Sequence, residues 1–325
     1  MTLKIPHFLW ALCLNKPEGP QDILPPQLET CLEQAHTLWL HVDYSDPAME
    51  QWLLEQHFLE PQIESGFFAE DTRPRSLILK NGLFLILRGL NLNPGAEPED
   101  MVSLRIWMEP TRIITAQRRT VHTFNKIHQS FLQRGAAITA SDFMVELMET
   151  LVNEIADVVE EAEEEIDAVE ESMVSAVQHN LRTRLADLRR EIIHLRRYLA
   201  PQREVMLRLS NEQIPWLSEH ARHRLRDAAD RLTKYVEDLD SARERAAITQ
   251  EELHNKITEV TSKRIYIFTL IASIFLPLSF VTSLLGINVG GIPGATNIYA
   301  FFIVCGILGF IALTISAVFR IKKWL

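Results

Sequence analysis

The sequence predicts a membrane protein of the α+β class: an N-terminal cytosolic α/β domain, a long-helix funnel or stalk, and two C-terminal transmembrane helices. Two apolar runs near the C-terminus, at 265–285 and 299–319, contain no Asp, Glu, Lys, Arg or His. Before them, apolar residues recur every three or four positions, which is typical of amphipathic helices. Earlier still, short apolar runs between turn residues are typical of strands. We therefore expect three parts, at 1–138, 139–264 and 265–325.

The N-terminal part combines strands with short helices. Its apolar runs are rich in β-branched and aromatic residues, which favour strands. Lys80, Asn81 and Gly82 fit a hairpin turn between two of them. A helix is expected at 47–58, after the first strand. The expected strands are 36–43, 76–79, 83–90, 101–108 and 112–116.

The middle part reads as long helices. Apolar residues recur at helical spacing over 151–177 and again over 181–199, where we expect Pro201 to interrupt the second helix. After Pro215 no proline occurs until Pro277. This predicts one helix of about 70 residues, on the order of 100 Å long, that continues into the first apolar run.

The first two of these helices differ in the sign of their charge. The chain carries a net charge of −10, but no Lys or Arg occurs between Gly135 and Asn180, and that stretch is crowded with Asp and Glu. The helix that follows is rich in arginine. One interpretation is an antiparallel helix pair whose exposed faces neutralise each other. Another is a reservoir of carboxylates that attracts divalent cations, and both can hold.

The two apolar runs predict a membrane hairpin. Each run is about 21 residues long, which as a helix matches a hydrocarbon core of roughly 30 Å. By the positive-inside rule the N- and C-termini face the cytoplasm and the uncharged loop 286–298 lies outside. No cleavable signal peptide is visible at the N-terminus. The basic residues that flank the runs are Lys263, Arg264, Arg320, Lys322 and Lys323.

Two helices cannot enclose a path for a solute, so a pore requires several copies around an axis. The first apolar run carries hydroxyl side chains and is the expected pore lining, with Asn288 forming a ring at its outer end. The alternative for each lining position is a helix–helix packing contact. Counting back from Asn288 in helical steps gives the candidates Ser283, Ser279, Leu276, Thr269, Phe268, Ile265 and Ser262. The candidates in the cytosolic funnel are Glu251, His254 and Glu259.

Metal-ligand patterns are few. His220 and His223 lie at i and i+3 of a predicted helix and could form a regulatory zinc site, but arginines crowd the same stretch and favour an ordinary exposed face. Neither apolar run contains an acid or a histidine, so the residues explain neither zinc selectivity nor a proton relay.

The residues Gly286, Ile287 and Asn288 at the outer end of the first run resemble the Gly-Met-Asn motif of the CorA family of divalent-cation transporters. The uncharged linker 290–294 and the C-terminal 322–325 resemble the ZntB zinc-transporter branch. The resemblance covers essentially the whole chain. It implies a homopentamer in the bacterial inner membrane that takes up Zn²⁺ as substrate by proton symport.

Transport of a largely hydrated ion would discriminate weakly, so Cd²⁺, Ni²⁺ and Co²⁺ are expected co-substrates. No cofactor is expected, and the expected partners are divalent cations, further copies of the chain and the lipid bilayer.

Other functions remain as alternatives. Ile287 replaces the Met of the magnesium branch and the outer loop has no acid, so a Mg²⁺/Co²⁺ channel is the second choice within the family. A membrane-anchored scaffold or signalling protein is disfavoured, because an outer loop of about 13 residues is too short to fold as a sensor. No HExxH, GxSxG or glycine-rich phosphate loop supports an enzyme. The acidic helix and the lack of an aromatic-rich basic patch disfavour nucleic-acid binding.

Overall fold

The computed structural model describes residues 8–33, 36–70, 72–175, 180–286, 294 and 297–321. The chain forms two compact units, Met1–Gln250 and Glu251–Leu325.

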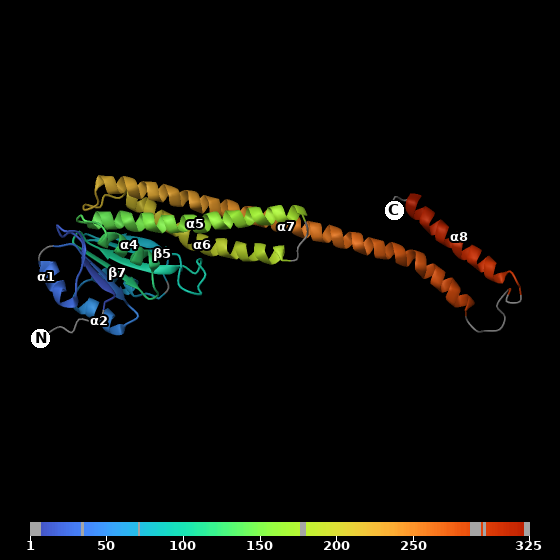
Figure 1. Cartoon of the computed structure of the whole chain (residues 1–325), viewed down its shortest axis with the longest axis horizontal. Coiled ribbons are helices and arrows are strands. Elements are labelled where there is room, and N and C mark those ends of the chain that lie inside the picture. Colours follow the sequence, from blue (N-terminus) through green and yellow to red (C-terminus); the bar gives the residue numbers. More distant parts are fainter. Residues whose placement is uncertain are drawn as a thin grey trace. The chain divides into compact units, whose positions relative to one another are not determined.

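The first unit contains a seven-stranded mixed sheet in the order β2-β1-β3-β7-β6-β5-β4 (Figure 1). Strands β3 and β7 are parallel, and every other neighbouring pair is antiparallel. The strands are β1 (Trp10–Cys13), β2 (Gln21–Asp22), β3 (Leu38–Asp43), β4 (Arg75–Ile78), β5 (Leu83–Gly89), β6 (Val102–Met108) and β7 (Arg112–Gln117).

Helices cover both faces of this sheet, because alternate side chains of its central strands are apolar on each side. On one face, Leu40 and Ala116 join a core with Met49 of α2 (Pro47–Glu55) and Phe67 of α3 (Pro61–Phe67). A short 3₁₀ turn (Pro25–Gln27) and α1 (Leu28–Glu33) precede β3.

The opposite face of the sheet packs against α4 (His122–Leu132) and α5 (Ala140–Ser175). Trp39 of β3 lies edge-on to Phe143 of α5, with 4.8 Å between the ring centroids. His41 of the same strand bonds the Thr115 hydroxyl at 2.7 Å, and burial lowers the pKa of His41 to about 3. His41 is therefore a neutral core residue.

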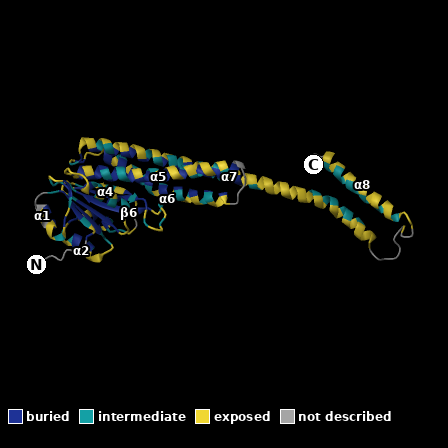
Figure 2. Ribbon diagram, in the orientation of Figure 1, coloured by how far each residue is buried: buried dark blue, intermediate teal, exposed yellow. Residues whose placement is uncertain are grey.

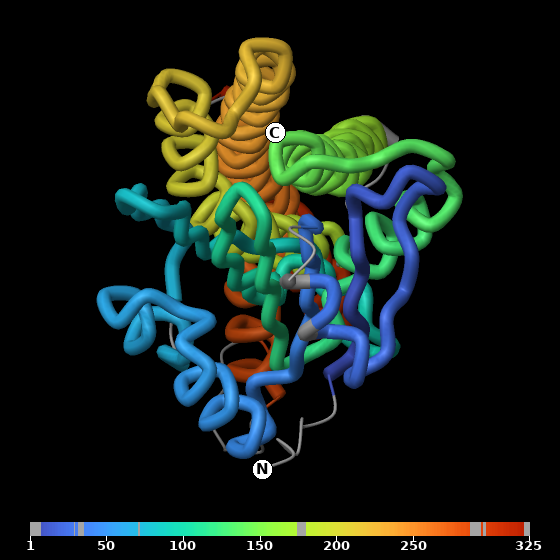
Figure 3. The backbone as a smooth tube through the Cα atoms, turned by 90° about the vertical axis from the view of Figure 1, so that its left-hand side faces the viewer, coloured from blue at the N-terminus to red at the C-terminus, as the bar shows by residue number. Residues whose placement is uncertain are grey.

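Long helices complete the first unit. They are α5, α6 (Leu181–Asn211) and the start of α7 (Glu219–Leu285), which has 67 residues. Figure 3 shows the green start of α5 and the gold start of α7 on the same side of the blue and cyan N-terminal segments. The prediction of one long helix that continues into the first apolar run is confirmed.

The predicted interruption at Pro201 is wrong, because α6 continues through it to Asn211. Proline lacks only one N–H, so the carbonyl four residues earlier loses one hydrogen bond. Beyond Pro201, apolar packing continues through Val205, Met206 and Leu209, all buried. This burial holds the helix together past the missing bond.

The predicted partners of the acidic helix need correction. Between α5 and α6 the structure shows one ion pair in the described residues, Arg184 with Glu165 at 2.8 Å. Other acids of α5 have partners elsewhere: on α7, Arg224 pairs with Glu149 and Arg245 pairs with both Asp167 and Glu170. Lys126 of α4 pairs with Glu154, and Arg134, just after α4, pairs with Glu146. The two helices of opposite charge therefore do not form a simple neutralising pair.

The second unit contains the last part of α7 and α8 (Ala300–Ile321). Both helices are long and apolar enough to cross a membrane, as the sequence predicts. Their apolar windows are 0% buried within the chain, and Figure 2 shows mostly exposed positions along both. Such apolar surface must be covered by lipid or by other copies of the chain.

Candidate functional site

The membrane-spanning part of α7 has two distinct faces. Its partly covered positions recur at helical spacing and form one stripe, which includes Leu270, Ile274, Pro277 and Val281. At about 100° per residue, the candidate lining residues fall on the opposite side of the helix. All of them are exposed: Ser262, Ile265, Phe268, Thr269, Leu276, Ser279 and Ser283.

The large apolar candidates are among the most exposed side chains of α7. Ile265, Phe268 and Leu276 are 60%, 72% and 75% exposed. Side chains of this size are rarely left in water as a continuous face. The face that carries them therefore needs a cover from outside the chain.

The hydroxyl groups on this face differ in what they can offer an ion. Thr269 donates its hydroxyl proton to the carbonyl of Ile265 at 2.8 Å, a bond that satisfies the side chain within its own helix. Ser279 and Ser283 donate no hydrogen bond to any residue that the structure describes. These two serines retain the capacity to bind water or a hydrated ion.

Gly286 follows α7 at the C-terminal end of its span. Its N–H bonds the carbonyl of Thr282 at 2.9 Å, and an added Cβ would lie 3.1 Å from that same oxygen. A side chain here would crowd the last turn, which suits glycine. Ile287 and Asn288, the other two residues of the predicted entry motif, lie outside the described residues.

The funnel candidates precede the span on α7. Glu251, His254 and Glu259 are all exposed, and none makes an ion pair within the described part of the chain. At about 100° per residue, Glu251 and His254 continue the line of the lining candidates, whereas Glu259 lies roughly a third of a turn away. Glu251 and His254 are therefore the better-placed pair.

His220 and His223 lie in the first turn of α7, and both are exposed. His223 borders a small cavity of about 150 Å³ whose lining includes Arg222 and Arg226. Among the described residues no group of three or more His, Cys, Asp and Glu side chains could hold a metal ion. Within the described residues the two histidines thus do not belong to a group of three metal ligands, and the cavity beside His223 is lined by Glu219 as well as the two arginines.

A cluster of arginines at one end of the sheet was not predicted from the sequence. The signal in the sequence was the presence of Arg88 and Arg105 inside apolar runs predicted as strands. Charged residues inside such strands are unusual unless they are paired or functional.

Comparisons with known proteins agree with this arrangement. The family model for the CorA-like Mg²⁺ transporter protein matches residues 34–323. The chain is 31% identical over 325 residues to the zinc transport protein ZntB of Yersinia enterocolitica, covering 100% of this chain and 98% of that protein. It is 38% identical over 312 residues to the divalent cation transporter CmaX of Pseudomonas aeruginosa, covering 94% and 90%. The solved structure of full-length CmaX matches with a TM-score of 0.85 and 35% identity, covering 98% of both chains.

The matched family is a family of membrane transporters and not an enzyme class, and an α/β and long-helix region followed by two apolar helices fits it. The chain belongs to the CorA-like Mg²⁺ transporter family and is a divalent cation transporter of the CorA/ZntB type. The resemblance and the fold class predicted from the sequence are both confirmed.

Proposed function

We propose that this chain forms a homopentameric pore in the bacterial inner membrane and admits Zn²⁺ to the cytoplasm with proton coupling. The observation that carries the proposal is the uncovered face of α7. It combines exposed apolar side chains with two serine hydroxyls that have no partner in the described chain. Symmetric copies around an axis would turn this face toward a shared path.

Along that path the residues have different roles. Gly286, Ile287 and Asn288 form the outer entry, where five Asn288 amides hold a hydrated ion. Ser283 and Ser279 replace part of its water shell. Leu276, Phe268 and Ile265 form apolar constrictions that gate by dewetting.

The orientation follows from flanking charge. Lys263, Arg264 and Arg320 border the two spans on the same side of the hairpin, which supports an orientation with both termini in the cytoplasm. In this proposal 1–138 is the cytosolic α/β domain, 139–264 the funnel and 265–325 the membrane hairpin.

Zinc as substrate is supported by the ZntB relative, which is called a zinc transport protein. Neither span in the described chain offers an acid or histidine, so the ion passes largely hydrated and Cd²⁺, Ni²⁺ and Co²⁺ compete. Because the spans lack acids and histidines, Glu251, His254 and Glu259, which precede the first span, are the proposed acid–base groups for proton coupling.

A second candidate is a channel for Mg²⁺ and Co²⁺. The CmaX relative favours it, because that protein is called a divalent cation transporter without restriction to zinc.

The test is ion flux into liposomes that contain the purified chain. Zn²⁺ and Mg²⁺ entry are measured with and without an inward proton gradient, beside an Asn288→Ala control. We expect Zn²⁺ entry that rises with the gradient and fails in the variant. Zn²⁺ entry that does not depend on the gradient would contradict proton symport. Mg²⁺ entry with negligible Zn²⁺ entry would identify Mg²⁺ as the substrate instead. Absence of any flux would favour a membrane-anchored scaffold or signalling protein.

A further inference from the structure

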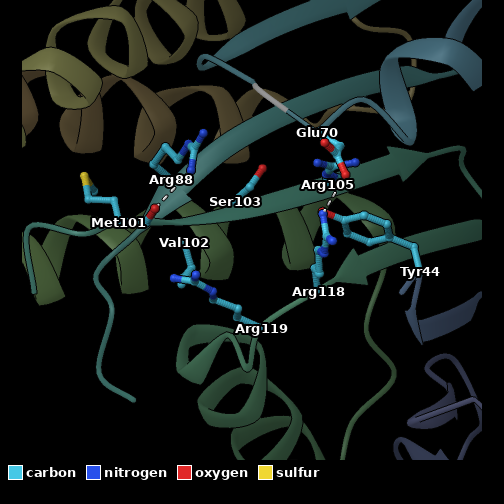
Figure 4. A pocket seen from close by; sticks show the side chains of 9 residues that line it. All are labelled: Tyr44, Glu70, Arg88, Met101, Val102, Ser103, Arg105, Arg118 and Arg119. Atoms are coloured by element: carbon cyan, nitrogen blue, oxygen red, sulfur yellow. Dashed lines mark hydrogen bonds and ion pairs between the residues drawn. The ribbon is translucent and has the colours of Figure 1, made fainter. Parts of the chain in front are cut away.

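Four arginines meet at one end of the sheet in the first unit (Figure 4). Arg118 and Arg119 directly follow β7, and Tyr44 directly follows β3. Because β3 and β7 are parallel neighbours, their carboxyl ends lie at the same edge of the sheet. In α/β sheets, ligands commonly bind beside the carboxyl ends of the parallel strands.

The antiparallel strands bring the other two arginines to the same place. Arg88, near the end of β5, pairs in register with Ser103 of β6. Arg105 lies two residues further along β6 and therefore projects from the same face as Ser103. Figure 4 shows Arg105, Arg118 and Tyr44 gathered beside Glu70, with Arg88 and Ser103 along the neighbouring strands.

These side chains line a cavity of about 180 Å³. Drug-sized ligands occupy pockets of about 300–1,000 Å³, so this cavity suits a much smaller group. Its lining contains four arginines, and its single carboxylate among the described residues is Glu70. The cavity is strongly cationic.

Arg105 is the fixed centre of the cavity. Its side chain is 0% exposed, and its two terminal nitrogens donate to the carbonyls of Phe67 and Ala69. Its guanidinium carbon lies 4.1 Å from the centre of the Tyr44 ring. The Nε atom has no hydrogen-bond partner in the described chain.

The charge of Arg105 is poorly compensated. Burial lowers the pKa of Arg105, and the charges of Arg88 and Arg118 lower it further. A buried cation whose neighbours are also cations gains from an anion placed among them.

Arg88 is held in place as firmly as Arg105. Its Nη1 donates to the carbonyl of Met101 at 3.0 Å, Nη2 donates to the carbonyl of Thr72, and the guanidinium carbon lies 4.6 Å from the Tyr198 ring centre. The cavity therefore has two arginines fixed by backbone and aromatic contacts, which is a built site rather than a loose surface patch.

The two outer arginines are less constrained. Arg118 pairs with Glu70 at 3.1 Å, but these side chains are 56% and 84% exposed, so the pair is weak and exchangeable. Arg119 is exposed and makes no ion pair with the described residues. Both can turn toward an anion that enters from solvent.

We propose that this cavity binds a phosphoryl group, either inorganic phosphate or the terminal phosphate of a small metabolite. Guanidinium groups match phosphate oxygens through paired N–H donors, and a doubly charged anion best compensates several arginines. The site lies wholly within residues 44–119, and it does not depend on the proposed ion path.

The test is isothermal titration calorimetry on the full chain in detergent, in metal-free buffer at constant ionic strength. Inorganic phosphate is expected to bind once per chain, and acetate at the same concentration is not. The double substitution Arg118→Gln with Arg119→Gln should weaken phosphate binding at least about tenfold, the factor expected for losing charge-assisted contacts. Arg119→Gln alone serves if the double variant has a lowered melting temperature.

Two further variants sharpen the result. Glu70→Gln removes the competing carboxylate and should tighten phosphate binding, an effect that general loss of structure cannot produce. Arg182→Gln, an exposed arginine on α6 with no ion pair in the described chain, is the matched control and should leave binding unchanged.

Glycerol 3-phosphate distinguishes the two sources. Tighter binding than phosphate identifies a metabolite, whereas equal or weaker binding identifies the free ion. The proposal is overturned if the wild-type chain binds no phosphate, or if the double variant and the Arg182→Gln control bind it equally well.

Discussion

Arg224 of α7 forms a bidentate ion pair with Glu149 of α5, with 2.9 Å from Nε to Oε1 and 2.6 Å from Nη2 to Oε2. The hydrogen bond to Glu149 also raises the pKa of Arg224. Two-point pairs of this kind fix geometry as well as charge. This contact ties the start of the long helix to the acidic helix within the first unit.

We predict that Arg224→Ala destabilises the first unit by about 1 kcal/mol, because both side chains remain partly exposed. For a unit of this size the melting temperature should fall by about 3 °C. Thermal unfolding followed by tryptophan fluorescence measures this change. Arg243→Ala is the matched control, since Arg243 only approaches Asp240 at 4.0 Å. Equal shifts in both variants would mean that the Glu149 pair contributes nothing.

A cluster of carboxylates gives a second prediction. Burial, followed by the charges of Glu99, Glu161, Glu165 and Glu97, raises the pKa of Glu191 to about 7, from an ordinary value of 4.5. The folded chain therefore holds the proton of Glu191 more tightly than the unfolded chain. Through this group, stability is greatest at low pH and decreases as pH rises from about 4.5 to about 7.

Glu191→Gln should remove this loss of stability at high pH. We expect the variant to melt at a higher temperature than the wild type at pH 8, and the two to converge near pH 5. Melting curves at several pH values provide the measurement. Glu171→Gln, an exposed acid on α5, should leave the pH profile unchanged. A Glu191→Gln profile parallel to that of the wild type would contradict the raised pKa.

The hydroxyls of α7 give a third prediction. The hydroxyl groups of Ser279 and Ser283 donate no hydrogen bond within the described chain, whereas the Thr269 hydroxyl donates to the carbonyl of Ile265. If these serines bind the ion's water, the double change Ser279→Ala with Ser283→Ala should slow Zn²⁺ flux by about fivefold, the rate equivalent of about 1 kcal/mol. Thr269→Ala should change flux less than twofold. The measurement is initial Zn²⁺ entry into liposomes at matched protein content.

Thr314→Ala on α8 is the control, because its hydroxyl also bonds its own helix, at the carbonyl of Phe310. A double serine variant with wild-type flux, or a loss equal to that of Thr269→Ala, would remove the serines from the ion path.

The sequence predicts the fold well where the pattern is long or strongly alternating. All five predicted strands exist, within about two residues at each end, and the long helix and both spans are present. β1 and β2, of four and two residues, were missed because they are too short to show an alternating pattern, so pairing rather than pattern defines them. Pro201 misled the prediction because tertiary burial outweighs one missing hydrogen bond.

The candidate site is predicted less completely. Helical counting places the lining candidates on one face of α7, since that step needs only the helix period. The difference between Thr269 and the two serines depends on side-chain rotamers, which a sequence does not specify. The arginine cavity was missed because its members come from four separate strands or strand ends that only the sheet register brings together.

The last prediction concerns proton coupling. In the described spans no acid or histidine is available, so coupling by acids or histidines must use groups that precede the span on α7 or groups in the first unit. Glu251 and His254 continue the line of the candidate path, and Glu259 does not. The double change Glu251→Gln with His254→Gln should therefore abolish the response of Zn²⁺ entry to a proton gradient, while entry without a gradient continues.

Glu259→Gln should keep the full response, which makes it the matched control for charge at this depth. The measurement is the ratio of Zn²⁺ flux with and without the gradient in each variant. A ratio unchanged in the double variant would move the coupling to a water wire or to the first unit.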